Sequence, residues 1–140
     1  MSGRYFLDSN VLIYSFDGSH PAKAQRAEEL ITEALTTNRG VISYQVVQEF
    51  FNFALRRAAR PMNTPDAEQF LDEVLRPLLS VHSSPALYVE ALRLHGRFRL
   101  PWYDSLIVAA AMQANCDILY SEDLQNGQRF GKMQVKNPFI

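Results

Sequence analysis

Four acidic residues of this 140-residue chain stand where a hydrophobic segment ends or a helix is expected. Asp8 closes the first apolar run, Asp104 opens a longer one, Asp123 follows another, and Glu49 lies in a helical stretch between them. Open α/β sheets gather such junction residues at one edge, where active sites lie. Crowded carboxylates repel one another unless a divalent cation neutralises them, and Mg²⁺ and Mn²⁺ prefer oxygen ligands. These residues therefore predict a metal-dependent acidic site.

Such a site can hydrolyse a phosphodiester bond. One cation helps to generate the attacking hydroxide, and the cations stabilise the charge that builds on the phosphate and on the leaving oxygen. Ser9 and Ser121 each adjoin a proposed ligand and could orient a carboxylate or a water molecule. Asn10 could do the same, or it could cap the following helix.

Each acid also has an ordinary structural interpretation. Asp8 could be a helix N-cap, Asp104 a residue favoured by a helix dipole, and Glu49 part of a solvated polar face. Glu122 and Asp123 could form a charged loop, and if the segment ends as a strand they point in opposite directions. The four acids together are less easily explained in this way than any one alone.

The remaining elements must bring these residues together. Apolar spacing, turn residues and proline positions predict alternating strands and helices, which indicates an α/β fold with a mostly parallel sheet covered on both faces. Chain length favours one domain over residues 1–140. Strands are expected at 4–7, 41–43, 78–82, 117–120 and 133–135, and helices at 11–16, 22–35, 44–59, 67–75, 85–98 and 103–115.

Composition excludes several classes of protein. A hydrophobic content of 47% with 21% charged residues is typical of a globular protein, not of a disordered one. No apolar run approaches the roughly 20 residues of a membrane helix, and no signal pattern opens the chain, so a cytoplasmic protein without membrane contact is expected. The lone Cys116 rules out an internal disulfide framework and is expected to be a small buried residue.

Four short motifs carry a family resemblance. They follow the first strand, lie in the third helix, open the sixth helix and follow the last buried strand, in the order Asp8-Ser9-Asn10, Gln48-Glu49-Phe50, Asp104-Ser105-Leu106-Ile107 and Ser121-Glu122-Asp123-Leu124. The ordered set resembles PIN domains from about residue 4 to the C-terminus. The short length resembles the VapC-type toxins of prokaryotic toxin–antitoxin pairs.

The resemblance implies a PIN-like three-layer sandwich and a Mg²⁺- or Mn²⁺-dependent endoribonuclease. Its catalytic and metal-binding residues would be Asp8, Glu49, Asp104 and Asp123, because Asp123 fits the family's serine/threonine–x–aspartate pattern. It also implies RNA as the substrate, a homodimer, and a cognate VapB-like antitoxin within a type II system. A catalytically dormant PIN-fold module that binds RNA or protein is the alternative.

Substrate contacts are expected just upstream of Asp104. Trp102 and Tyr103 could stack on an exposed base, as single-stranded RNA recognition often requires, and Arg97 and Arg99 could hold phosphates. Two ordinary interpretations stay open here: Trp102 could fill the core or a dimer interface, and the arginines could belong to a solvated helix face.

Overall fold

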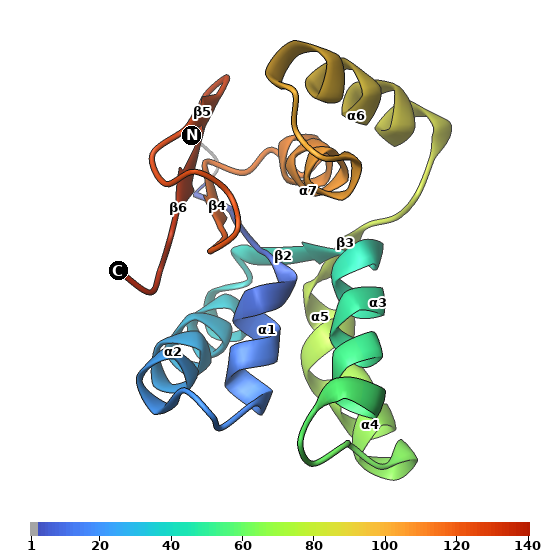
Figure 1. The fold of residues 1–140 in the computed structure, drawn as a ribbon, viewed down its shortest axis with the longest axis vertical. Helices are drawn as coiled ribbons and strands as arrows, with labels where there is room; N and C mark the ends of the chain where they lie inside the picture. Colours follow the sequence, from blue (N-terminus) through green and yellow to red (C-terminus); the bar gives the residue numbers. More distant parts are fainter. Residues whose placement is uncertain (1–2) are drawn as a thin grey trace.

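The computed structural model of the protein describes residues 3–140, and its centre is one mostly parallel sheet (Figure 1). The sheet order is β3-β2-β1-β4-β6-β5, and every neighbouring pair is parallel except β5 and β6. The strands are β1 (Tyr5–Leu7), β2 (Gly40–Ser43), β3 (Leu79–Val81), β4 (Ile118–Tyr120), β5 (Arg129–Phe130) and β6 (Met133–Lys136). The expected α/β class with a mostly parallel sheet is confirmed.

Helices cover both faces of this sheet and complete the expected three layers. Figure 1 shows α1 to α5 on one side and α6 with α7 on the other. The helical elements are α1 (Ser9–Phe16), α2 (Pro21–Thr37), α3 (Tyr44–Asn52), the π-helical turn η1 (Phe53–Arg57), α4 (Thr64–Phe70), the π-helical turn η2 (Leu71–Leu75), α5 (Arg76–Leu78), α6 (Pro85–Phe98) and α7 (Trp102–Gln113).

Burial explains why β1 and α7 carry such continuous apolar runs. All three residues of β1 are buried, as a strand covered by helices on both faces requires. Residues 105–111 of α7 are all buried as well, because this helix is packed against both α6 and the sheet. Cys116 is buried just before β4, as expected.

The structure differs most from the predicted elements in two places, and the bounds of the other elements shift by at most two residues. The helix expected at 67–75 begins at Thr64 and continues through η2 and α5 to Leu78. The π-helical turn η2 ends two residues before Pro77, whose ring would clash in a regular α-helix with the carbonyl four residues earlier. Strand β5 was not expected, because two residues before a glycine turn at Gly131 (φ 60°) are too short to show a pattern.

None of the helices within residues 3–140 has both the length and the apolarity needed to cross a bilayer.

Candidate active site

The four acids predicted from the sequence lie on four different elements. Asp8 directly follows β1 and caps α1, Asp123 lies in the loop after β4, Asp104 is in the first turn of α7, and Glu49 is in α3. Because β1 and β4 are adjacent and parallel, their carboxyl ends meet at one edge of the sheet. The charge of Asp123 acts on Asp8, Glu49 and Asp104 alike, so the four carboxylates form one electrostatic group.

Asp8 is the buried member of this group, with only 5% of its surface exposed. Its Oδ1 accepts a hydrogen bond of 2.7 Å from the Ser9 amide, and its Oδ2 accepts one of 2.7 Å from the Ser121 hydroxyl. Burial raises the pKa of Asp8 to about 7, although these two hydrogen bonds act to lower it, and the charges of Asp123 and Glu49 raise it further. Near neutral pH this carboxylate is therefore protonated in a large fraction of molecules, and a bound cation would favour its ionised form.

Glu49 and Asp104 are half-buried and are perturbed in the same direction. Burial raises the pKa of Glu49; hydrogen bonds from Ser9 and Gln45 lower it, and the charges of Asp123 and Asp104 raise it. Burial also raises the pKa of Asp104, with the charge of Asp123 adding to the effect. Carboxylates that are partly buried and close to one another resist ionisation. A bound cation would offset this repulsion.

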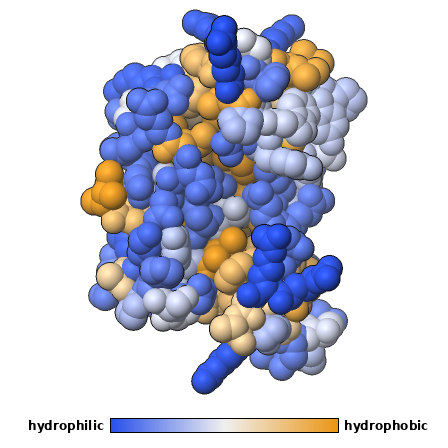
Figure 2. All heavy atoms as spheres, in the orientation of Figure 1, coloured by the Kyte–Doolittle hydropathy of each residue, from blue (hydrophilic) through white to orange (hydrophobic). Residues whose placement is uncertain are grey.

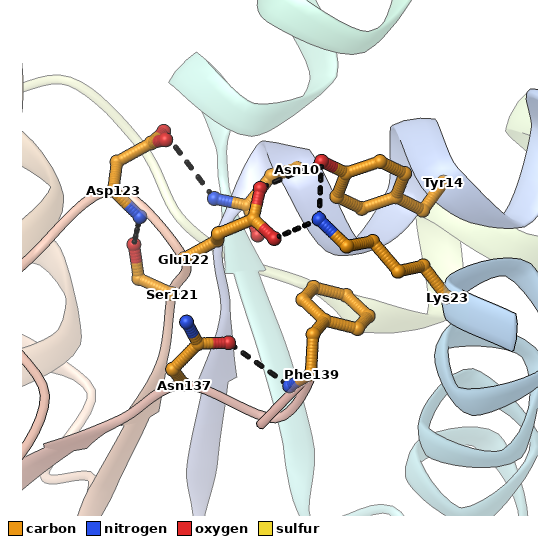
Figure 3. Close-up of polar contacts among 8 residues, drawn as sticks. All are labelled: Asn10, Tyr14, Lys23, Ser121, Glu122, Asp123, Asn137 and Phe139. Atoms are coloured by element: carbon orange, nitrogen blue, oxygen red, sulfur yellow. Dashed lines mark hydrogen bonds and ion pairs between the residues drawn. The ribbon is translucent and has the colours of Figure 1, made fainter. Parts of the chain in front are cut away.

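The adjacent acids Glu122 and Asp123 have different surroundings (Figure 3). Glu122 is held away from the acidic group, because the Tyr14 hydroxyl donates to its Oε1 at 2.6 Å and Lys23 Nζ lies 2.6 Å from its Oε2. Asp123 instead accepts a hydrogen bond of 3.3 Å from Asn10 Nδ2, and its own amide donates to the Ser121 hydroxyl at 3.1 Å. Asp123 is thus the one of the two whose charge faces the other acids.

The oxygen atoms of this group suit a hard divalent cation, although the carboxylates do not form a preformed metal site. Within residues 3–140 no three His, Cys, Asp or Glu side chains converge closely enough to hold a metal ion. Mg²⁺ keeps several of its waters and needs only one or two direct carboxylates, so a closed cage is not required. Asn10 Oδ1 and Gln45 Oε1 are buried without a hydrogen-bond partner, which leaves two further oxygen acceptors next to the acids.

The amino-acid sequence of the chain matches a known protein family. Residues 5–129 match the family model described as the PIN domain. The chain belongs to the PIN domain family. No curated protein sequence gives a match.

Solved structures similar to this PIN domain come from toxin–antitoxin pairs. A toxin–antitoxin complex from Klebsiella pneumoniae has a TM-score of 0.65 at 18% identity, over 96% of this chain and 97% of that one. VapBC2 from Rickettsia felis, bound to a DNA fragment from its promoter, has a TM-score of 0.64 at 17% identity, over 95% and 97%. VapC20 from Mycobacterium tuberculosis, described as a sarcin–ricin loop cleaving toxin, has a TM-score of 0.61 at 16% identity, over 85% and 89%. At these identities the likeness establishes the fold.

The residues expected to contact substrate lie at the end of α6 and the start of α7. Tyr103 is 66% exposed and Trp102 is half-buried against the core. Arg97 lies on the last turn of α6, and Arg99 caps that helix with a left-handed backbone (φ 58°). The Tyr103 ring is therefore open to solvent, whereas Trp102 packs against the core, as its ordinary interpretation had it.

Tyr14, Lys23 and Gln45 were not expected at the site from the sequence. Tyr14 and Lys23 reach Glu122 across about a hundred positions of sequence. Gln45 Nε2 donates to the Tyr103 carbonyl at 3.2 Å and so joins α3 to the start of α7. The position of Gln45 four residues before Glu49, on the same helix face, is the one signal that could have indicated its part.

Proposed function

We propose that the protein is a metal-dependent endoribonuclease that hydrolyses RNA phosphodiester bonds and acts as the toxin of a type II toxin–antitoxin pair. The observation that carries this proposal is the electrostatic group of Asp8, Glu49, Asp104 and Asp123 at the carboxyl edge of the sheet, in which three of the acids have raised pKa values. Such a group is costly to a fold unless a cation binds there.

The four acids would be both the metal ligands and the catalytic residues, with Mg²⁺ or Mn²⁺ as the cofactor. When bound, the cation supplies an activated water and stabilises the negative charge on the phosphate. Asp8 is the most rigid ligand, because the Ser9 amide and the Ser121 hydroxyl fix both of its oxygens. Ser9, Asn10 and Ser121 orient the carboxylates without contacting the substrate.

The names of the structural relatives support the partners in this proposal. VapC20 is described as a toxin that cleaves the sarcin–ricin loop, and the other structures are toxin–antitoxin complexes. We expect an antitoxin of the VapB type to bind this chain, and RNA to be its substrate. A homodimer is also expected, and the exposed apolar side chains Tyr88, Val89 and Leu92 on α6 are candidates for its contact surface.

The test is cleavage of a total RNA pool by antitoxin-free protein in Mg²⁺, Mn²⁺ or EDTA. The wild type is compared with Asp104→Asn and with Glu73→Gln, a matched loss of one acidic charge on η2. Discrete fragments that need a metal, vanish in Asp104→Asn and persist in Glu73→Gln are the expected result. A folded wild type that binds RNA but cuts none with either metal would overturn the enzyme and favour the dormant binding module.

A further inference from the structure

A hollow of about 490 Å³ opens on the surface between α6, the end of α7 and β5. Three arginines from two elements line it: Arg93 and Arg97 from α6, and Arg129 from β5. Figure 2 shows strongly hydrophilic side chains projecting at the end of the molecule where α6 and β5 lie. We name this feature the arginine hollow.

The arginine hollow carries an excess of positive charge. Glu90 is the acidic residue in its lining, and its Oε2 lies 3.9 Å from Arg93 Nη1, at the limit of an ion pair. Arg97 and Arg129 form no ion pair with any residue in the described part of the chain. Three guanidinium groups against one carboxylate leave a net charge of about +2, which favours an anionic ligand.

Aromatic rings form the wall beneath these arginines. The Arg97 guanidinium lies 5.2 Å from the centre of the Phe98 ring, and Phe98 packs edge-on against Phe130 at 4.9 Å. Stacking on an aromatic face restricts a guanidinium and leaves its N–H groups free to donate. The planar donors can therefore hold a phosphate in a bidentate manner.

We propose that the arginine hollow is a second RNA-binding site, which holds backbone phosphates of the strand that is cut at the acidic group. This inference rests on the proposed ribonuclease function. It assigns Arg97 and Arg129, with Arg93 beside them, to phosphate contacts that lie away from the scissile bond. The phosphates supply affinity and register without base specificity.

The geometry of α7 links this site to the acidic group. Asp104 stands in the first turn of α7, and Met112, which lines the hollow, comes eight residues later in the same helix. At 1.5 Å per residue the two positions are about 12 Å apart along the helix axis. Residues 105–111 of α7 are buried, so a strand that occupies both sites passes over the outer surface, by a path longer than this axial spacing. A run of several nucleotides covers such a path.

Nucleic acid explains the arrangement better than an acidic peptide does. Arg93 and Arg97 come from successive turns of one helix and Arg129 from a separate strand, so the donors are spread over several ångströms. A polymer with a regular series of phosphates can engage them all. A peptide with one phosphoserine would engage one part of the hollow.

The test measures RNA binding without cleavage. Fluorescence anisotropy of a labelled single-stranded RNA is followed in EDTA over a range of salt concentrations for the wild type and the double variant Arg97→Gln/Arg129→Gln. The control is Arg39→Gln/Arg76→Gln, which loses the same charge at exposed arginines that pair with Glu33 and Asp72 instead. Circular dichroism checks that both variants keep the wild-type fold.

The double variant in the hollow is expected to bind roughly 10-fold more weakly at low salt, with the control close to wild type. The slope of log affinity against log salt should also become shallower by about 0.7 for each phosphate that the variant no longer neutralises. Equal affinities and slopes for the two double variants would overturn the proposal. Selective loss of binding to a phosphoserine peptide, with RNA binding retained, would overturn it in favour of a peptide site.

These outcomes are separate from those of the cleavage experiment. RNA binding through the hollow by a protein that cuts nothing supports the site and overturns the ribonuclease. Metal-dependent cutting with unchanged binding by the hollow variant supports the ribonuclease and overturns the site.

Discussion

The Ser121 hydroxyl donates a hydrogen bond of 2.7 Å to Asp8 Oδ2 across 113 positions of sequence. This hydrogen bond joins the residues that follow β1 and β4, the two strands at the centre of the sheet. It is buried, and the same hydroxyl accepts the Asp123 amide at 3.1 Å. One serine therefore fixes the most buried acid and the backbone of the fourth acid together.

Ser121→Ala is expected to weaken metal binding, by roughly 10-fold, because the variant lacks the hydrogen bond that helps to ionise Asp8. The pKa of Asp8 should rise above about 7, so the deficit should shrink as the pH is raised. The measurement is the dependence of Tm on Mg²⁺ or Mn²⁺ concentration below and above pH 7. Ser15→Ala, whose hydroxyl donates to the Leu12 carbonyl in α1, is the control. Equal metal affinities in the two variants would contradict the prediction.

Asp8 should make the metal-free protein less stable as the pH rises. Its pKa is about 7 in the folded state, above the ordinary value of 3.8, so the folded protein retains a proton that the unfolded chain releases between these values. Its favourable contribution is therefore complete below about pH 3.8, is lost as the pH rises to about 7, and changes little above it.

Asp8→Asn removes the titrating carboxyl group and should therefore reduce the dependence of stability on pH. In EDTA above pH 7, the variant is expected to exceed the wild type in Tm, by roughly 3–5 °C if the gain is about 1 kcal/mol. Calorimetry in EDTA across this pH range checks the difference. A wild type that stays as stable as the variant above pH 7 would show that the Asp8 carboxylate is not destabilising.

Lys23→Met is expected to weaken metal binding by roughly 10-fold while changing Tm only slightly. Lys23 and Tyr14 hold Glu122, and without the ammonium group Glu122 is free to move towards the acids and displace Asp123 (Figure 3). Lys132→Met is the matched control, because Lys132 pairs with Asp117 at 3.3 Å, at the opposite end of β4. The metal affinities of the two variants are measured from the rise in Tm with metal concentration. Equal decreases in metal affinity would reject the role of Lys23.

Gly40→Ala is expected to destabilise the fold by about 1–3 kcal/mol. A methyl group at Gly40 would lie 2.2 Å from the Ala34 Cβ and 3.2 Å from a Tyr5 ring carbon, because α2 packs directly on the start of β2. Gly96→Ala, with open space around it in α6, should instead stabilise by about 0.5–1 kcal/mol. Urea unfolding measures both, and a neutral Gly40→Ala would contradict the close packing.

The sequence by itself was sufficient to predict the sheet, the layers and the segments that carry the acids. The buried strands before Asp8 and Asp123 and the largely apolar stretch of α7 after Asp104 are local patterns, and parallel strands bring their carboxyl ends to one edge. Strand β5 and the continuation of a helix through Pro77 escaped prediction, because a two-residue strand and a π-helical turn leave no periodic pattern.

Only the tertiary structure decided the surroundings of each acid. Glu122 and Asp123 are neighbours in sequence and alike in chemistry, but Lys23 and Tyr14 bind the first, and Asn10 and Ser121 contact the second. The arginine hollow likewise depends on Arg129 of β5 meeting Arg93 and Arg97 of α6. Such contacts join residues far apart in the chain, and no local pattern of residue types encodes them, because they are set by how the helices pack on the sheet.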